Sequence, residues 1–125
     1  MNPTFRSYRD LEVWQRSMRL AKRIYQVTEA FPTSERFGLT NQLRRASVSL
    51  ASNLAEGHAR AGPGEFSRFI SISMGSLAEL ETQILLSTDL GYIDAQTSGE
   101  ILAESDTIGK MLRGLAKSIS QRRRG

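Results

Sequence analysis

Positively charged side chains are the groups in this sequence whose type and spacing best suit a chemical role, and phosphate is the ligand that they match. Arg16, Arg19, Lys22 and Arg23 project together if the segment before Pro32 is helical. Guanidinium groups fit phosphate oxygens, and each neutralised phosphate releases counterions. The candidate nucleic-acid-binding residues are Arg16, Arg19, Lys22, Arg23, Arg44, Arg45, Arg122, Arg123 and Arg124. The alternative is that these charges only solvate helix faces.

The other side chains argue against catalysis and metal binding. The chain has one histidine, His58, and no cysteine, which excludes thiolate zinc sites, iron–sulfur clusters and cysteine nucleophiles. A di-metal site in a helical bundle needs Glu-x-x-His pairs, but Ala55 stands three residues before His58. The glycine-rich stretch 57–64 lacks the lysine and the preceding strand of a phosphate loop, and we interpret it as a turn with a solvated histidine. We therefore expect no enzymatic activity, no cofactor and no metal.

Glu81 is the carboxylate that most needs a partner. The spacing places it near the edge of an apolar face, between Leu77 and Leu85. An unpaired buried charge costs several kcal/mol, so we expect a structural ion pair with an arginine. Arg45 is the assigned partner, with Arg44 as the neighbouring alternative.

Breaker residues divide the chain into four long segments that must position these groups. Pro32 ends the first segment, the stretch 57–64 separates the second from the third, and Gly91 followed by Asp94 offers a helix stop and an N-cap between the last two. Apolar residues recur at helical spacing in every segment, and no stretch alternates with period two. Four amphipathic helices with short connections predict an all-α fold, an up-and-down antiparallel four-helix bundle.

The predicted core faces of the last three helices are Leu39, Leu43, Ala46, Leu50 and Leu54; Phe66, Ile70, Leu77, Leu80 and Ile84; and Ile101, Ile108, Leu112, Leu115 and Ile119. The first helix has two apolar stripes, one of Trp14, Met18, Ala21 and Tyr25 and a second of Val13, Leu20, Ile24, Val27 and Phe31. Either the whole helix is well buried, or the second stripe meets another subunit. The third helix has a face of small residues, Ser67, Ser71, Gly75, Ala78 and Thr82, for which close packing inside the monomer is favoured over a subunit contact.

Length and charge set the boundaries of the domain. A chain of 125 residues fits one domain, here residues 10–120, preceded by an extension at 1–9 and followed by a flexible basic tail at 121–125. The tail arginines supply three of the net four positive charges. No apolar run reaches the ~20 residues of a membrane span, and the first residues do not resemble a signal peptide, so we expect a cytoplasmic protein.

The sequence also resembles a family, the bacterial 23S rRNA intervening-sequence proteins. The resemblance rests on DLEVWQRSMRLAKRIY at 10–25, FPTSERFGLTNQLRRASVSLASNLAEG at 31–57 and EFSRFISISMGSLAELETQILLSTDLGYI at 65–93. It covers residues 5–119, so it does not extend to the terminal arginines. It implies a four-helix bundle that assembles as a homopentamer and has no established enzymatic activity, with a more distant similarity to the accessory variability protein of diversity-generating retroelements.

The family pattern falls on residues that suit packing, register or interfaces: Leu39, Gln42, Leu43, Arg44, Arg45, Asn53, Glu56, Gly57, Glu65, Phe66, Gly75, Glu79, Leu80, Glu81 and Gln83. Two functions follow from the residues and the resemblance together. The first is a non-enzymatic homo-oligomer that binds RNA or DNA through basic helix faces. The alternative is a scaffold or accessory subunit that binds a protein partner, for example a reverse transcriptase, without a direct role in nucleic-acid binding.

Overall fold

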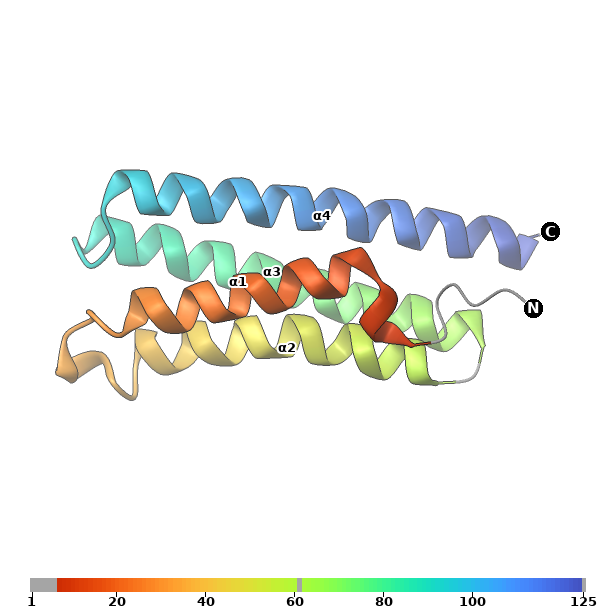
Figure 1. Cartoon of the computed structure of the whole chain (residues 1–125), viewed down its shortest axis with the longest axis horizontal. Helices are drawn as coiled ribbons and strands as arrows, with labels where there is room; N and C mark the ends of the chain where they lie inside the picture. Colours follow the sequence, from red (N-terminus) through yellow and green to blue (C-terminus); the bar gives the residue numbers. More distant parts are fainter. Residues whose placement is uncertain (1–6, 61, 125) are drawn as a thin grey trace.

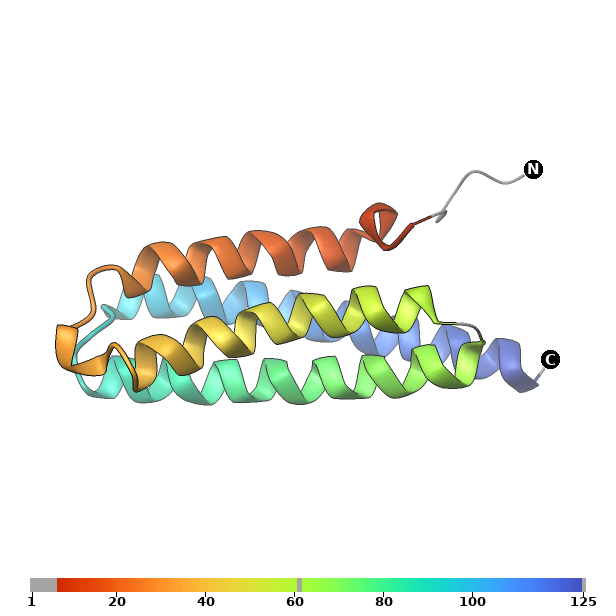
Figure 2. The same cartoon turned by 90° about the horizontal axis from the view of Figure 1, so that it is seen from below.

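A computed structural model describes residues 7–60 and 62–124. Its helices are η1 (Tyr8–Asp10), α1 (Glu12–Thr28), η2 (Thr33–Glu35), α2 (Leu39–Ala59), α3 (Pro63–Asp89) and α4 (Ala95–Arg124), where η marks a 3-10 helix. The four α helices run alternately up and down and pack side by side (Figures 1 and 2). No strand occurs in the described ranges, so the prediction of an all-α four-helix bundle is confirmed.

The core consists of one apolar stripe from each helix. Ile24 of α1, Leu50 of α2, Ile84 of α3 and Leu112 of α4 are fully buried. The predicted core faces of the last three helices are buried except for Phe66 and Leu115, which are partly buried against the same cluster. Burying a side chain of this size contributes about 1.5–3 kcal/mol. This contribution favours the orientation in which the periodic apolar residues of each helix face the core.

The sequence predicted the connection between α3 and α4 more accurately than the one between α2 and α3. Gly91 has the positive φ of a helix stop, +82°, and Asp94 accepts a hydrogen bond from the Thr97 amide at 2.7 Å, as an N-cap does. The expected turn at 57–64 is shorter, because α2 continues through His58 to Ala59. A Cβ at Gly57 would lie 2.5 Å from the Cβ of Phe69, so this glycine allows α2 and α3 to approach closely.

The two apolar stripes of α1 have different environments, and the alternative in which the second stripe meets another subunit is wrong. The second stripe, represented by Leu20 and Ile24, lies in the core and cannot meet another subunit. Met18 and Tyr25 of the first stripe are 46% and 44% exposed. The wide apolar arc of α1 therefore covers the core on one side and leaves a partly exposed edge next to α2.

The face of small residues on α3 points outward, contrary to the packing that we favoured. Ser71, Gly75, Ala78 and Thr82 are exposed. A Cβ at Gly75 would meet nothing within 4 Å. Close helix packing instead occurs on the neighbouring side, where buried Ser73 donates a hydrogen bond to the Leu50 carbonyl at 3.0 Å.

Helical structure extends into the described parts of both segments that we expected to flank the domain. In the expected extension, η1 places Tyr8 against Trp14, with ring centroids 5.2 Å apart. The backbone of α4 stays helical through Arg124, where we expected a flexible tail from residue 121 onward. The last turns of α4 project past the connection between α2 and α3 (Figures 1 and 2).

Candidate nucleic-acid interface

The predicted basic face of α1 is partly neutralised by α4. Arg23 contacts Glu100 at 2.7 Å, and Arg16 contacts Glu104 at 3.3 Å. The hydrogen bond from Arg23 and then that from Gln96 hold the pKa of Glu100 below its ordinary value. Two of the four cations on this face are therefore tied to acidic side chains of the neighbouring helix.

Arg19 and Lys22 are the other two cations of this face. Both are exposed, and neither has an ion-pair partner within the described ranges. Arg19 lines a groove of about 300 Å³ between α1 and α4, beside Arg16, Glu100 and Glu104. Because two carboxylates share this groove, it is less positive than the spacing of basic residues on α1 indicated.

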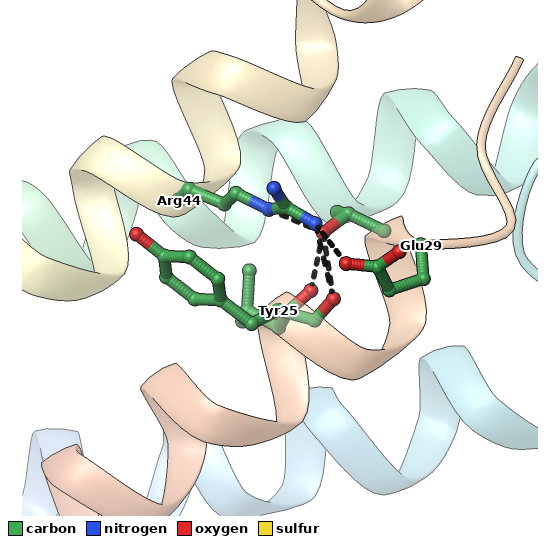
Figure 3. A network of polar contacts seen from close by, with 5 residues as sticks. Tyr25, Glu29 and Arg44 are labelled. Carbon is green, nitrogen blue, oxygen red and sulfur yellow. Dashed lines mark hydrogen bonds and ion pairs between the residues drawn. The ribbon is translucent and has the colours of Figure 1, made fainter. Parts of the chain in front are cut away.

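Arg44 has a structural role that joins α1 to α2. Its Nε donates to the Thr28 hydroxyl at 2.9 Å, and its Nη2 donates to the Tyr25 carbonyl at 3.3 Å and to Glu29 at 3.2 Å (Figure 3). The guanidinium carbon also lies 4.6 Å from the centroid of the Tyr25 ring. With Nε and Nη2 engaged at the end of α1, Arg44 is poorly placed to bind a phosphate.

Arg45, one residue later, faces solvent. It lines a groove of about 280 Å³ between α2 and α3 together with Ser49, Glu79 and Gln83. Neither Arg45 nor Glu79 forms an ion pair with another described residue, and Gln83 Oε1 is buried without a hydrogen-bond partner. This groove holds unpaired charges of both signs.

Glu81 is paired with a serine, and the expected ion pair with Arg45 is wrong. Its carboxylate accepts a hydrogen bond from the buried Ser105 hydroxyl of α4. Arg45 instead shares its groove with Glu79. Glu79 and Glu81 are two residues apart on α3, which separates their side chains by about 200° around the helix axis. They therefore face neighbouring helices on opposite sides of α3. Glu81 connects α3 to α4, and it lines a groove formed by residues of these two helices.

Further cations lie on the second half of α4, and the sequence pattern had indicated only the terminal arginines among them. Residues 94–106 contain four acidic and no basic residues, whereas residues 107–125 contain six basic and no acidic ones. The net charge of the whole segment hides this division, whereas the separate net charges of its two halves reveal it. The newly found residues are Lys110, Arg113 and Lys117. The side chains of Arg122, Arg123 and Arg124 lie outside the described part, and only their helical backbone is placed.

Other kinds of site find no support in the described ranges. No group of three or more histidine, cysteine or acidic side chains there could hold a metal ion. None of the described helices combines the length and the apolar character that a membrane crossing requires. His58 lies in α2, half-buried and edge-on to Phe66 with ring centroids 5.5 Å apart, where we expected a solvated histidine in a turn.

Comparisons with known proteins identify the family of this bundle and a solved structure of similar fold. The family model of the 23S rRNA-intervening sequence protein matches residues 9–114, so the chain belongs to that family. A solved structure from Bacteroides thetaiotaomicron, described as a protein with unknown function from the S23 ribosomal protein family, superposes with a TM-score of 0.76. It is 23% identical, and the match covers 84% of this chain and 98% of that one, which supports the fold. A comparison with curated proteins gives no match.

Proposed function

We propose that this chain is a non-enzymatic, cytoplasmic subunit of a homopentamer that binds RNA or DNA through its positive surface. The observation that carries the proposal is an outer face of α2 and α3 on which apolar side chains and unpaired charges lie exposed together. This outer face consists of Asn41, Arg45, Val48 and Ser52 from α2 and Ile72, Gly75, Glu79 and Leu86 from α3. All eight residues are exposed.

Both the apolar and the charged residues of this face favour a second copy as its occupant. Val48 and Ile72 are 45% and 39% exposed, and burying the exposed part of each would contribute about 1 kcal/mol. Arg45 and Glu79 are unpaired across the same groove, so a neighbouring copy can offer each of them an opposite charge. Gly75 presents no side chain and lets another backbone approach. Five copies, the number that the family resemblance implies, would also repeat each positive patch around a ring and strengthen its field.

The mass in solution tests the assembly. Light scattering should give about five times the chain mass of 13.9 kDa, and Val48→Glu or Ile72→Glu should lower it, because either change buries a charge in the interface. Leu85→Glu is the matched control, since Leu85 is 52% exposed on the side of α3 away from α2. A monomeric wild-type protein, or an equal effect of the control, would remove the proposed interface.

A protein-binding scaffold or accessory subunit, for example of a reverse transcriptase, is the second candidate, and Phe37 favours it. Phe37 is 84% exposed in a turn that hydrogen bonds to the Glu35 side chain hold in place. Glu35 accepts hydrogen bonds from the Leu39 amide at 3.1 Å and from the Tyr92 hydroxyl at 3.0 Å, and the latter bond raises the pKa of Tyr92. A rigid exposed aromatic is a typical anchor for a partner protein. Phe37→Ser should abolish capture of that partner at unchanged thermal stability, and retained capture would exclude this anchor.

A further inference from the structure

The charges of α4 are divided along its length. Only the acidic half forms ion pairs with another helix of the bundle, among the described residues. The acidic half contains Glu100 and Glu104, which pair with arginines of α1. The basic half begins at residue 107 and contains no acidic residue. Within it, Lys110 pairs with Asp106 one turn earlier, at 3.3 Å. Arg113 and Lys117 have no ion-pair partner among the described residues, and Arg113 lines a groove that also contains Glu81 and Asp106.

Helix stability does not explain these two cations. The negative end of a helix dipole favours basic side chains, but the effect fades within the last turn, and Arg113 lies about three turns before Arg124. Two like charges four residues apart, as at Arg113 and Lys117, destabilise a helix by about 0.2–0.5 kcal/mol. Both cations therefore stay available on an exposed face for a ligand of opposite charge.

The position of this half of α4 suits an extended polyanion. Its apolar side is held in the bundle by Leu112 and Ile119, which are buried, so the basic side is fixed in orientation. The final turns project beyond the rest of the bundle (Figure 2). From Arg113 to Arg124 the helix rises about 16 Å, a length over which a nucleic-acid duplex presents roughly ten phosphates.

We propose that the basic half of α4, from Lys110 through Arg113 and Lys117 to Arg122–Arg124, is the surface that binds the sugar-phosphate backbone of RNA or DNA, and that the basic face of α1 is not. This inference rests on the proposed function and names its binding surface. Four of the six cations are arginines, whose forked geometry matches phosphate oxygens. The contacts reach the backbone alone, so the binding is independent of base sequence.

A membrane surface is the competing polyanion, and the packing disfavours it. Helices that lie on membranes insert an apolar face below the headgroups. The apolar face of α4 is already occupied by the bundle core, as the burial of Leu112 and Ile119 shows. A nucleic acid requires no such insertion, because counterion release alone drives binding of this kind.

The chain offers a closely matched pair of variants for the test. Arg113→Gln/Lys117→Gln removes one arginine and one lysine from α4, and Arg19→Gln/Lys22→Gln removes the same two charges from exposed, unpaired positions on α1. Binding of the full chain to RNA and DNA duplexes of about 20 base pairs is measured across a salt series, with anionic vesicles as a further probe. Each lost phosphate contact should lower the salt slope by about 0.9 and weaken binding several-fold at 0.1 M salt.

The expected result is that the α4 variant lowers the salt slope by about two and weakens duplex binding roughly tenfold or more, while the α1 variant keeps both near wild type. Equal loss in the two variants would mean that net charge alone matters, and it would overturn the assignment to α4 while leaving nucleic-acid binding intact. Loss of duplex binding in the α1 variant alone would also overturn the assignment to α4 while leaving nucleic-acid binding intact. No duplex binding by the wild type at low salt, or binding to vesicles only, would overturn the proposed function as well.

Discussion

Arg23 and Glu100 lie 77 residues apart in the sequence and meet with 2.7 Å between Nη2 and Oε1. Together with Arg16 and Glu104, this pair ties the basic face of α1 to the acidic half of α4. The same contacts remove two cations from the surface that the sequence favoured for binding. They therefore link α1 to α4 and also restrict where an anionic ligand can bind.

Neutralising the acidic partners should restore the basic face of α1. In Glu100→Gln/Glu104→Gln, Arg23 loses its carboxylate partner and Arg16 keeps only Glu12, at 3.6 Å. Up to two more phosphate contacts then form, and the salt slope of duplex binding steepens by as much as about two. Titrations of the variant and the wild type at several salt concentrations measure the change. An unchanged slope would show that this face does not reach the ligand even when its arginines are free.

Arg44 should contribute to stability and leave ligand binding unchanged. Arg44→Gln removes the charged donors from Thr28, from the Tyr25 carbonyl and from Glu29, which should cost about 1–3 kcal/mol in the free energy of unfolding. Arg45→Gln is the control, because Arg45 is exposed and its loss should stay within about 0.5 kcal/mol. Denaturant unfolding compares the two. Equal effects would contradict the role of Arg44 as a link between α1 and α2.

Glu81 should stabilise the packing of α4 on α3. Glu81→Ala leaves the buried Ser105 hydroxyl without its acceptor and should lower the free energy of unfolding by about 1–3 kcal/mol. Glu79→Ala changes an exposed carboxylate on the same helix and should have a much smaller effect on the unfolding of the isolated chain. If thermal unfolding did not separate these variants, the Glu81–Ser105 contact would have no energetic importance.

Two glycines should respond to alanine in opposite directions. At Gly57 the new Cβ would meet the Cβ of Phe69 at 2.5 Å, so α2 and α3 must separate and stability should fall by about 1–3 kcal/mol. At Gly75 nothing lies within 4 Å, and alanine should stabilise the helix by about 0.5–1 kcal/mol. Unfolding curves recorded below the concentration of self-association test both. Destabilisation by Gly75→Ala would mean that α3 is packed more tightly there than the structure shows.

The helices could be predicted because their signals are local. Periodic leucines and isoleucines, the stop at Gly91 and the cap at Asp94 are each read within one or two turns. Contacts between helices depend on rotation and register, which no single segment encodes. The sequence pattern could therefore identify Glu81 as a carboxylate in need of a partner, but it could not choose Ser105 over Arg45. For the same reason, Arg16 and Arg23 looked like free cations until α4 was placed beside α1.

Lysine-directed cross-linking tests the central claim most directly, because the chain contains only three lysines, Lys22 on α1 and Lys110 and Lys117 on α4. RNA with a periodate-oxidised 3′ end forms a Schiff base with a nearby lysine amine, and borohydride reduction makes the link permanent. Peptide mapping then locates the modified lysine in the full-length protein. The account predicts links at Lys117 and Lys110. Links concentrated at Lys22 would contradict it and return the binding surface to α1.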